Sequence, residues 1–326
     1  MQFHLALEPT PFAHKIDHKD KLFLAGSCFT EQIGAKLSAH KFRTIENPKG
    51  ILFNPVSISN SILSYIENKV YTAEDIFLNG EVWGSWDHHT RFSNLDKDKC
   101  IRDINTSMQA ANGFLQEADW LLLTLGSAFV YERSDGTVVA NCHKIPADKF
   151  RKRLLTPEEI VSTFDTMIHR LKQFNPGIKI IFTISPVRHL RDGFVENNRS
   201  KACLIQAVHH LVDKFEGLFY FPAYELVIDD LRDYRFFAED MAHPNYAATN
   251  YVWEKFIGAC INELTQLIMK EINVINAAVQ HKPFFPTSQA HQKFLAVNLQ
   301  KLLSLKERFP YIDLSKELAF FTDVDR

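Results

Sequence analysis

The sequence is poor in glycine and has no block of charge of one sign. Its 12 glycines among 326 residues follow no period, which excludes a collagen-like chain. Basic and acidic residues number 37 and 39, are well mixed, and leave a formal net charge of −2. Nucleic acid and anionic membranes both demand a concentrated positive face, so neither is expected as a partner. Hydrophobic residues make up 46% and charged residues 23%, which excludes a disordered chain.

Several other features are absent. The five scattered cysteines include no CxxC pair, so neither a disulfide framework nor structural zinc is expected. No apolar run reaches the roughly 18 residues that cross a membrane, and the amino-terminal stretch lacks the pattern of a signal peptide. No Gly-x-Gly-x-x-Gly or Walker loop occurs, which weakens the case for nucleotide binding. We therefore expect a cytoplasmic protein without cofactor or metal. Its oligomeric state stays open.

Short apolar runs bounded by turn signals predict the strands. Four are clear and one is weaker: residues 21–25, 119–125, 178–185 and 218–222, and the weaker 41–46. They do not alternate with polar residues, which suits a parallel sheet buried on both faces. Helical patterns lie between and after them, at residues 156–174, 201–215 and 247–269. Strands alternating with helices predict a doubly wound α/β sheet.

Two stretches do not follow this alternation. Residues 47–117 are rich in aromatic residues, Asn, Ser and His, and we expect them to form an insertion after the second strand, with short helices of its own. From about residue 282 the chain is rich in Pro and Phe and then offers one more helix, near 290–305. We therefore predict a main domain over residues 1–280 and an appendage over 281–326 that packs on it.

The first candidate for chemistry follows the first predicted strand, where Gly26-Ser27-Cys28-Phe29-Thr30 leads into a helical pattern. In open α/β sheets, ligands bind at the carboxyl ends of strands, near helix N-termini whose N–H groups stabilise an oxyanion. A serine hydroxyl there needs a base, because it is a weak nucleophile at neutral pH. Cys28 is the alternative nucleophile, but neighbours in such a turn point in different directions, so only one can serve. The turn alone is also compatible with a plain helix cap.

A base is offered by Asp240-Met241-Ala242-His243-Pro244-Asn245, just before the last helix of the main domain. A carboxylate three residues ahead of a histidine can bind its Nδ1 side and leave Nε2 free to accept a proton from serine. By itself, this segment is also compatible with a surface loop and a helix cap. Together with Ser27, it predicts a Ser–His–Asp unit with contacts of roughly 2.6–3.2 Å.

These residues carry a resemblance. The pentapeptide Gly26–Thr30 closely resembles the Gly-Ser-Cys-Phe-Ala signature of the GSCFA family. Further stretches similar to this family lie at residues 47–55, 88–93, 141–144, 185–189 and 191–193. The family in turn resembles the SGNH, or GDSL-like, hydrolases. The resemblance implies a flavodoxin-like three-layer α/β/α sandwich with a mostly parallel five-stranded sheet, and ester hydrolysis or acyl transfer. It also implies that Ser27 is the nucleophile, His243 the base and Asp240 the group that orients the base.

The chain departs from the wider superfamily at two positions. Gly26 directly precedes Ser27, where the superfamily has an Asp between the two. Gly126-Ser127-Ala128 stands where a Gly-x-Asn is expected, and alanine has no side chain that can donate to the oxyanion. Losing one such donor typically lowers the rate by about 10²–10³. The candidates for a replacement are, in order, the Gly50 backbone N–H, the Ser127 hydroxyl and the Asn141 side chain.

Other polar residues are open to two interpretations. His88, His89 and Arg91 could recognise a substrate carboxylate or sugar hydroxyls, or could form a solvated turn. Arg188 follows a central strand and could anchor an anion or make a structural salt bridge. Residues 141–144 (NCHK) contain two possible metal ligands, but no second cluster lies at a useful spacing.

The sequence thus predicts a serine esterase or acyltransferase acting on an ester of a small polar molecule or carbohydrate. The alternative is a non-catalytic ligand-binding module on the same scaffold. The missing oxyanion asparagine favours the alternative, whereas the intact Ser27 and the Asp-x-x-His pair oppose it.

Overall fold

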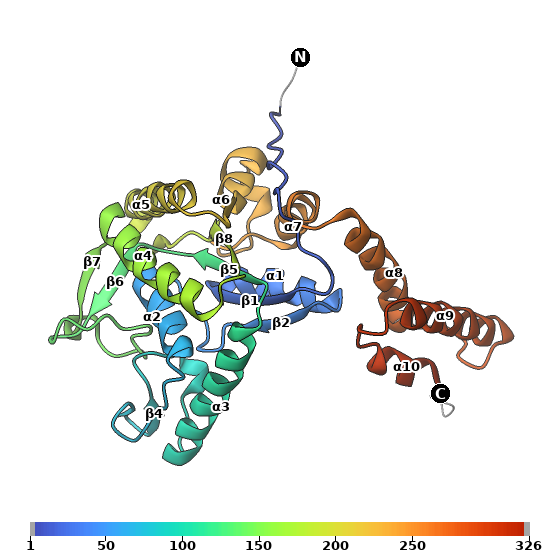
Figure 1. Ribbon diagram of the computed structural model, residues 1–326, viewed down its shortest axis with the longest axis horizontal. Helices are drawn as coiled ribbons and strands as arrows, with labels where there is room; N and C mark the ends of the chain where they lie inside the picture. Colours follow the sequence, from blue (N-terminus) through green and yellow to red (C-terminus); the bar gives the residue numbers. More distant parts are fainter. Residues whose placement is uncertain (1–3, 323–326) are drawn as a thin grey trace.

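A five-stranded parallel sheet forms the centre of the computed structural model, which describes residues 4–322 (Figure 1). The strands, in sheet order, are β2 (Arg43–Glu46), β1 (Lys21–Gly26), β5 (Trp120–Leu125), β8 (Lys179–Ile184) and β9 (Leu218–Phe221). Every neighbouring pair is parallel, so all carboxyl ends meet at one edge of the sheet. All five predicted strands, including the weaker one at 41–46, are confirmed.

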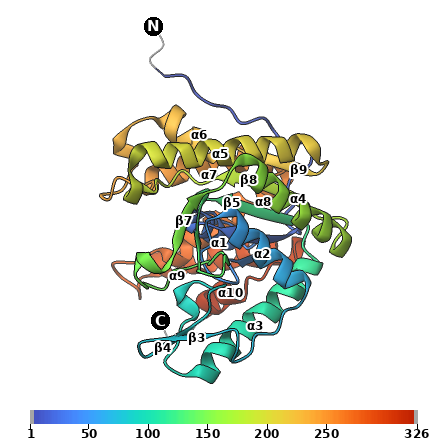
Figure 2. The ribbon, with the colours of Figure 1, turned by 90° about the vertical axis from the view of Figure 1, so that its left-hand side faces the viewer.

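Side chains on each strand alternate between two hydrophobic cores, one on each face of the sheet. In β1, Phe23 and Ala25 enter one core, whereas Leu22 and Leu24 enter the other. The first core is covered by α2 (Pro55–Ile66), α3 (Lys97–Gln116), α4 (Pro157–Phe174) and α5 (Gly193–Lys214). The second is covered by α1 (Cys28–Ala39), α6 (Ala223–Glu225), the π-helical turn η4 (Leu226–Leu231) and α7 (Tyr246–Cys260). Helices on both faces of the sheet confirm the predicted three-layer α/β/α sandwich (Figure 2).

One predicted helix is wrong in its length. Residues 247–269 do not form one helix, because the chain breaks between α7 and α8 (Glu263–Gln280). At the break, the Ile16 N–H donates to the Cys260 carbonyl at 2.7 Å, and the Asn262 N–H donates to the Ile16 carbonyl at 3.1 Å. Asn262 then caps α8 by accepting from the Thr265 N–H. The bridge to Ile16 stops the first helix, and a new N-cap starts the second.

The segment after β2 contains more than short helices. It holds α2, the hairpin β3 (Phe77–Asn79) and β4 (Val82–Gly84), the short helix η1 (Thr90–Phe92), and the 20-residue α3. A second hairpin, β6 (Phe129–Glu132) with β7 (Arg151–Leu154), follows β5 and was not among the predicted strands. Short helices η2 (Ala147–Lys149), η3 (Leu190–Asp192) and η5 (Tyr234–Phe236) complete the loops.

The carboxyl-terminal helices form a unit with its own core. Helices α8, α9 (Gln289–Arg308) and α10 (Ser315–Thr322) lie beside the sandwich, in orange to red in Figure 1. Their shared cluster begins at Ile268 and ends at Phe321, so packing brings α8 into the appendage whose start is predicted at 281. Among residues 4–322, no helix is both long enough and apolar enough to cross a membrane.

Candidate active site

The turn that holds Ser27 is tightly built. Gly26 ends β1 with φ +147°, and a Cβ there would overlap the Thr124 carbonyl of β5, so only glycine fits. Ser27 is the N-cap of α1 and its Oγ accepts from the Phe29 N–H at 3.3 Å. Its own N–H donates to the Thr124 carbonyl at 3.1 Å. Ser27 is only 3% exposed, so its side chain is almost fully buried at the carboxyl end of β1.

The Asp240–His243 pair lies in an exposed loop before α7. His243 Nδ1 lies 2.6 Å from Asp240 Oδ2, the contact that the spacing of the two residues predicts. Asp240 Oδ1 also accepts from the N–H groups of Ala242 and His243, at 2.9 and 3.0 Å. These hydrogen bonds, first that of the His243 N–H, lower the pKa of Asp240 to about 2. Asp240 is therefore ionised at neutral pH and keeps a proton on Nδ1, which leaves Nε2 as the basic nitrogen.

Arg188 supports this loop. Its backbone N–H donates to the Ala242 carbonyl at 3.0 Å, and its guanidinium lies 3.5 Å from the Met241 carbonyl oxygen. The guanidinium carbon also lies 3.9 Å from the centre of the Phe237 ring. Met241 has φ +55°, a conformation that a non-glycine residue adopts only when its surroundings hold it. The backbone and the guanidinium of Arg188 both contact the loop of Asp240–His243, which we call the base loop after the role predicted for His243. The structure therefore gives Arg188 a supporting position at this loop.

A side-chain hydrogen bond joins α1 and α7, the helices that follow the two halves of the candidate site. Thr249 Oγ1 donates to Gln32 Oε1 at 2.7 Å, and both residues lie about one turn after the start of their helices. Ser27 precedes the first helix and His243 precedes the second. No hydrogen bond joins Ser27 to His243 among the residues described; Ser27 Oγ accepts from the Phe29 N–H, which leaves its O–H available to donate. The His243 side chain is 44% exposed.

The three candidate oxyanion donors are already hydrogen-bonded within the chain. The Gly50 N–H donates to the Asn47 carbonyl at 2.7 Å. Ser127 Oγ lies 3.2 Å from Ser200 Oγ and accepts from the Phe129 N–H at 3.1 Å. Asn141 Oδ1 accepts from the His143 N–H at 2.7 Å. The Gly50 N–H would have to leave its partner to donate to a substrate, whereas the Asn141 amide nitrogen would not. Either hydroxyl of the Ser127–Ser200 pair can be its donor.

His89 and Arg91 lie beside the Gly50 turn. A Cβ on Gly50, which has φ +83°, would overlap the His89 side chain, so the turn and the histidine are packed together. Arg91 donates to Glu31 Oε1 at 3.1 Å and also to the Asn47 carbonyl. Arg91 thereby ties this turn to α1, the helix that Ser27 caps.

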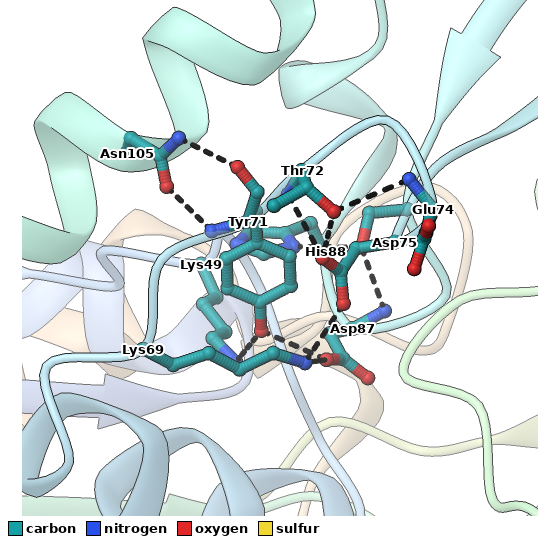
Figure 3. A network of polar contacts seen from close by, with 10 residues as sticks. Lys49, Lys69, Tyr71, Thr72, Glu74, Asp75, Asp87, His88 and Asn105 are labelled. Carbon is teal, nitrogen blue, oxygen red and sulfur yellow. Dashed lines mark hydrogen bonds and ion pairs between the residues drawn. The ribbon is translucent and has the colours of Figure 1, made fainter.

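His88 lies apart from them, buried inside the insertion. Its Nδ1 pairs with Ser85 Oγ at 3.1 Å, and its ring packs edge-on against Tyr71. Figure 3 shows His88 beside a chain of polar groups. In this chain, Lys49 Nζ donates to the Tyr71 hydroxyl at 2.7 Å, and the Tyr71 hydroxyl donates to Asp87 at 2.8 Å. Its complete burial keeps His88 away from any ligand at the surface.

Residues 141–144 do not form a metal centre. His143 Nε2 pairs with the Ser85 carbonyl at 2.9 Å, and burial raises the pKa of the Cys142 thiol. Within residues 4–322, no group of three or more His, Cys, Asp or Glu side chains gathers as a ligand set.

A cavity of about 340 Å³ opens at the carboxyl edge of the sheet. Its walls combine aromatic side chains with polar ones: Phe53, Phe129, Tyr131, Ser127, Asn141, Lys152, His189 and Arg191 among them. Lys152 forms an ion pair with Asp192 at the same cavity. A site of this size accepts a small ligand and offers both stacking surfaces and hydrogen-bonding groups.

Two residues at or next to this cavity, His189 and Lys201, were not singled out from the sequence. Lys201 is 1% exposed and donates to the Gly126 carbonyl at 2.7 Å and the Ser185 carbonyl at 2.6 Å, at the ends of β5 and β8. Burial lowers its pKa to about 7. His189 lies beside Gly126, and its pKa falls to about 4 through burial, then through the charges of Lys201 and His243. The 185–189 motif could have pointed to His189, whereas a lysine in a helical pattern gives no such signal.

Comparisons with known proteins place the chain. Similar solved structures include a carbohydrate esterase family 3 protein from Talaromyces cellulolyticus, at 10% identity and TM-score 0.36, covering 77% of this chain and 99% of that one. An alpha/beta hydrolase enzyme from the metagenome of Lake Arreo, Spain, is similar at 14% identity and a TM-score of 0.36. This match covers 76% of this chain and 99% of that one. An acetyl xylan esterase from the rumen bacterium Butyrivibrio proteoclasticus is similar at 12% identity and a TM-score of 0.36. This match covers 79% of this chain and 66% of that one. A search of curated proteins finds no match.

Family models match both parts of the chain. The model of the GSCFA family matches residues 21–256, which include the sheet, the Ser27 turn and the base loop. The model of the GSCFA domain protein, C-terminal domain, matches residues 272–324. The first match alone spans well over half of the sequence, and the chain therefore belongs to the GSCFA family.

Proposed function

We propose that this protein is a serine esterase or acyltransferase of the SGNH type that acts on an ester of a small polar molecule or carbohydrate. One observation carries the proposal: the 2.6 Å contact between Asp240 and His243, in a loop that is hydrogen-bonded to Arg188 after β8, while Ser27 follows β1. An ionised carboxylate that fixes the Nδ1 tautomer makes Nε2 a general base. The cavity at the same edge has the mixed aromatic and polar walls that suit such a substrate.

In this mechanism, Ser27 Oγ attacks the acyl carbonyl while His243 takes the hydroxyl proton. His243 then gives that proton to the leaving alcohol, and water or an acceptor alcohol removes the acyl group from Ser27 by the reverse steps. Closure of the hydrogen bond between Ser27 and His243 accompanies substrate binding, since such contacts are often long without ligand and tighten in the complex. The half-exposed His243 side chain has the freedom to make this movement.

A fluorophosphonate probe tests the proposal directly. We expect the probe to label the wild-type protein on Ser27, as mapped by mass spectrometry, and we expect turnover of at least one member of a panel of acetylated sugars and small alcohols. Labelling elsewhere, or turnover that persists in Ser27→Ala, would contradict the assignment.

A non-catalytic ligand-binding module is the second candidate. The alanine at position 128, which has no side chain that can donate to an oxyanion, favours it. In that case, calorimetry should detect binding of a sugar or small alcohol, and the protein should neither take up the probe nor turn over an ester.

A cytoplasmic location stays a prediction, which cell fractionation tests.

A further inference from the structure

His189 has a ring nitrogen without a partner at the edge of the cavity. Its Nε2 atom is buried and makes no hydrogen bond to any residue that the structure describes. A buried polar atom without a partner is unfavourable, so in a native protein it calls for an explanation such as a ligand that pairs with it. The same residue lines the 340 Å³ cavity together with Ser127 and Phe53.

The surroundings of Nε2 include the turn where the superfamily asparagine is missing. A Cβ built on Gly126 would lie 3.2 Å from His189 Nε2 and 2.7 Å from the Phe53 Cβ. Glycine at 126 therefore lets Phe53 and His189 approach this turn more closely than a side chain would allow. Gly126 follows β5, the strand that pairs with β1, so His189 Nε2 lies against the same edge of the sheet as Ser27.

The histidine is held in place before any substrate arrives. Its backbone N–H donates to Asn197 Oδ1 at 2.9 Å, and its ring packs on Phe53 with 5.3 Å between the ring centres. Asn197 is itself buried in α5. A donor fixed in this way needs no reorganisation when charge develops in the transition state, which is what makes such donors effective.

The charge of its surroundings keeps the imidazole neutral. Burial, and then the nearby charges of Lys201 and His243, lower the pKa of His189 to about 4, whereas Asp192 acts in the opposite direction. A neutral imidazole carries one N–H, and with the proton on Nε2 it donates one hydrogen bond without giving the proton up. Burial raises the pKa of the Cys28 thiol next to Ser27, and the nearby Lys201 opposes this rise.

We propose that the Nε2–H of His189 donates to the oxyanion formed at Ser27, in place of the asparagine side chain that this chain lacks at position 128. The inference rests on the proposed esterase function. In the step concerned, the bond between Ser27 Oγ and the acyl carbon forms and the hydroxyl proton passes to His243. The carbonyl π pair moves to oxygen, which accepts from His189. When this intermediate collapses, the leaving alkoxide takes the proton from His243.

Substitution at 189 tests the inference. We expect His189→Ala to lower kcat on the best ester of the panel by about 10²–10³, the effect of removing one oxyanion donor, with KM changed less than about threefold. His189→Gln keeps an N–H donor and should recover at least tenfold of that loss. His209→Ala removes an exposed histidine of α5 and serves as the matched control, with unchanged kcat. A His189→Ala variant within fivefold of the wild-type kcat would overturn the inference.

A second measurement follows the imidazole proton directly, in the wild-type protein and in His189→Gln. Proton and nitrogen NMR of histidine-labelled protein should show one strongly deshielded imidazole N–H when the fluorophosphonate adduct forms on Ser27, absent from His189→Gln. An adduct without this signal overturns the assignment of His189 alone. A wild-type protein that neither forms the adduct nor turns over an ester overturns the proposed function instead.

Discussion

The nucleophile and the base of the proposed site lie in very different surroundings. Ser27 is 3% exposed and sits between two strands and a helix, with its N–H bonded to Thr124 of β5. Asp240 and His243 have side chains that are 50% and 44% exposed, in a loop that Arg188 holds from one side. The difference teaches that the position of the nucleophile comes from the sheet itself, whereas the position of the base comes from a few loop contacts. Substitution of Ser27 should therefore abolish the chemical step itself. Substitutions that loosen the loop of Asp240 and His243 should instead lower the rate by misaligning the base.

The largest effect should come from Ser27→Ala. Removal of the nucleophile leaves only binding and oxyanion contacts, so we expect turnover to fall by at least about 10⁴ and probe labelling to vanish. Circular dichroism and the melting temperature check that the fold is kept. Substantial residual turnover in this variant would mean that the buried turn does not hold the nucleophile.

Loss of the base should be almost as severe. We expect His243→Ala to reduce turnover nearly as much as Ser27→Ala, and the double variant to be no worse than either alone, because members of such a unit are not additive. Asp240→Asn should lower kcat by up to about 10⁴, since it favours the wrong tautomer of His243. Steady-state kinetics of the four proteins measures this, and additive losses would show that the two residues act separately.

A titration of stability separates the buried side from the exposed loop. Burial lowers the pKa of Lys201 to about 7 in the folded protein, against 10.5 for an ordinary lysine. Between these values the unfolded chain binds more protons, so the free energy of unfolding should rise with pH, by up to about 1.4 kcal/mol per pH unit from this group.

Urea unfolding at pH 7 to 10 of the wild type and Lys201→Met measures this contribution. The variant should lack the Lys201 share of the slope and keep that of Lys49, whose pKa burial lowers to about 8. Asp240, with its pKa near 2, should leave stability unchanged over this range. Equal slopes in the two proteins would contradict the burial of a titrating lysine at position 201.

A smaller effect should follow from loosening the base loop. Arg188→Ala removes the guanidinium that contacts the Met241 carbonyl and the Phe237 ring, while its backbone hydrogen bond to Ala242 remains. We expect kcat to fall by roughly tenfold, since misplacement of a catalytic group by about 1 Å can lower rates up to 10²-fold. Arg235→Ala, which removes an exposed arginine paired with Asp233, is the control. Loss of binding without loss of kcat would instead favour Arg188 as an anion anchor.

The smallest effect should come from Cys28→Ala. Burial raises the pKa of the Cys28 thiol, so it is protonated and unreactive at neutral pH. We expect full labelling on Ser27, turnover near that of the wild type and a loss of about 1 kcal/mol in the free energy of unfolding, as for a small truncation in a packed region. An inactive Cys28→Ala beside an active Ser27→Ala would reverse the choice of nucleophile.

Strand positions were predictable because buried parallel strands leave continuous apolar runs, such as the one around Trp120–Leu125. The start of the helix predicted at 156–174 was predictable for a similar reason, since Thr156 and Glu159 form a capping box within one turn. The break between α7 and α8 was not, because the stop comes from pairing with Ile16, about 245 positions earlier in the chain. The β6–β7 hairpin was missed as well: its strands are short, partly exposed and rich in charged residues in β7.

By itself, the sequence determined the strands of the parallel sheet, the Ser27 turn and the spacing of Asp240 and His243, because each depends on residues close together in the chain. Only the tertiary structure decided that His88 is buried, that Arg188 supports the base loop, and that Lys201 lies beneath the ends of two strands. Burial and partnership depend on which distant segments pack together, and a local pattern carries no record of that packing. The neutral His189 beside Gly126 belongs to the same class, since its protonation follows from neighbours that folding alone assembles.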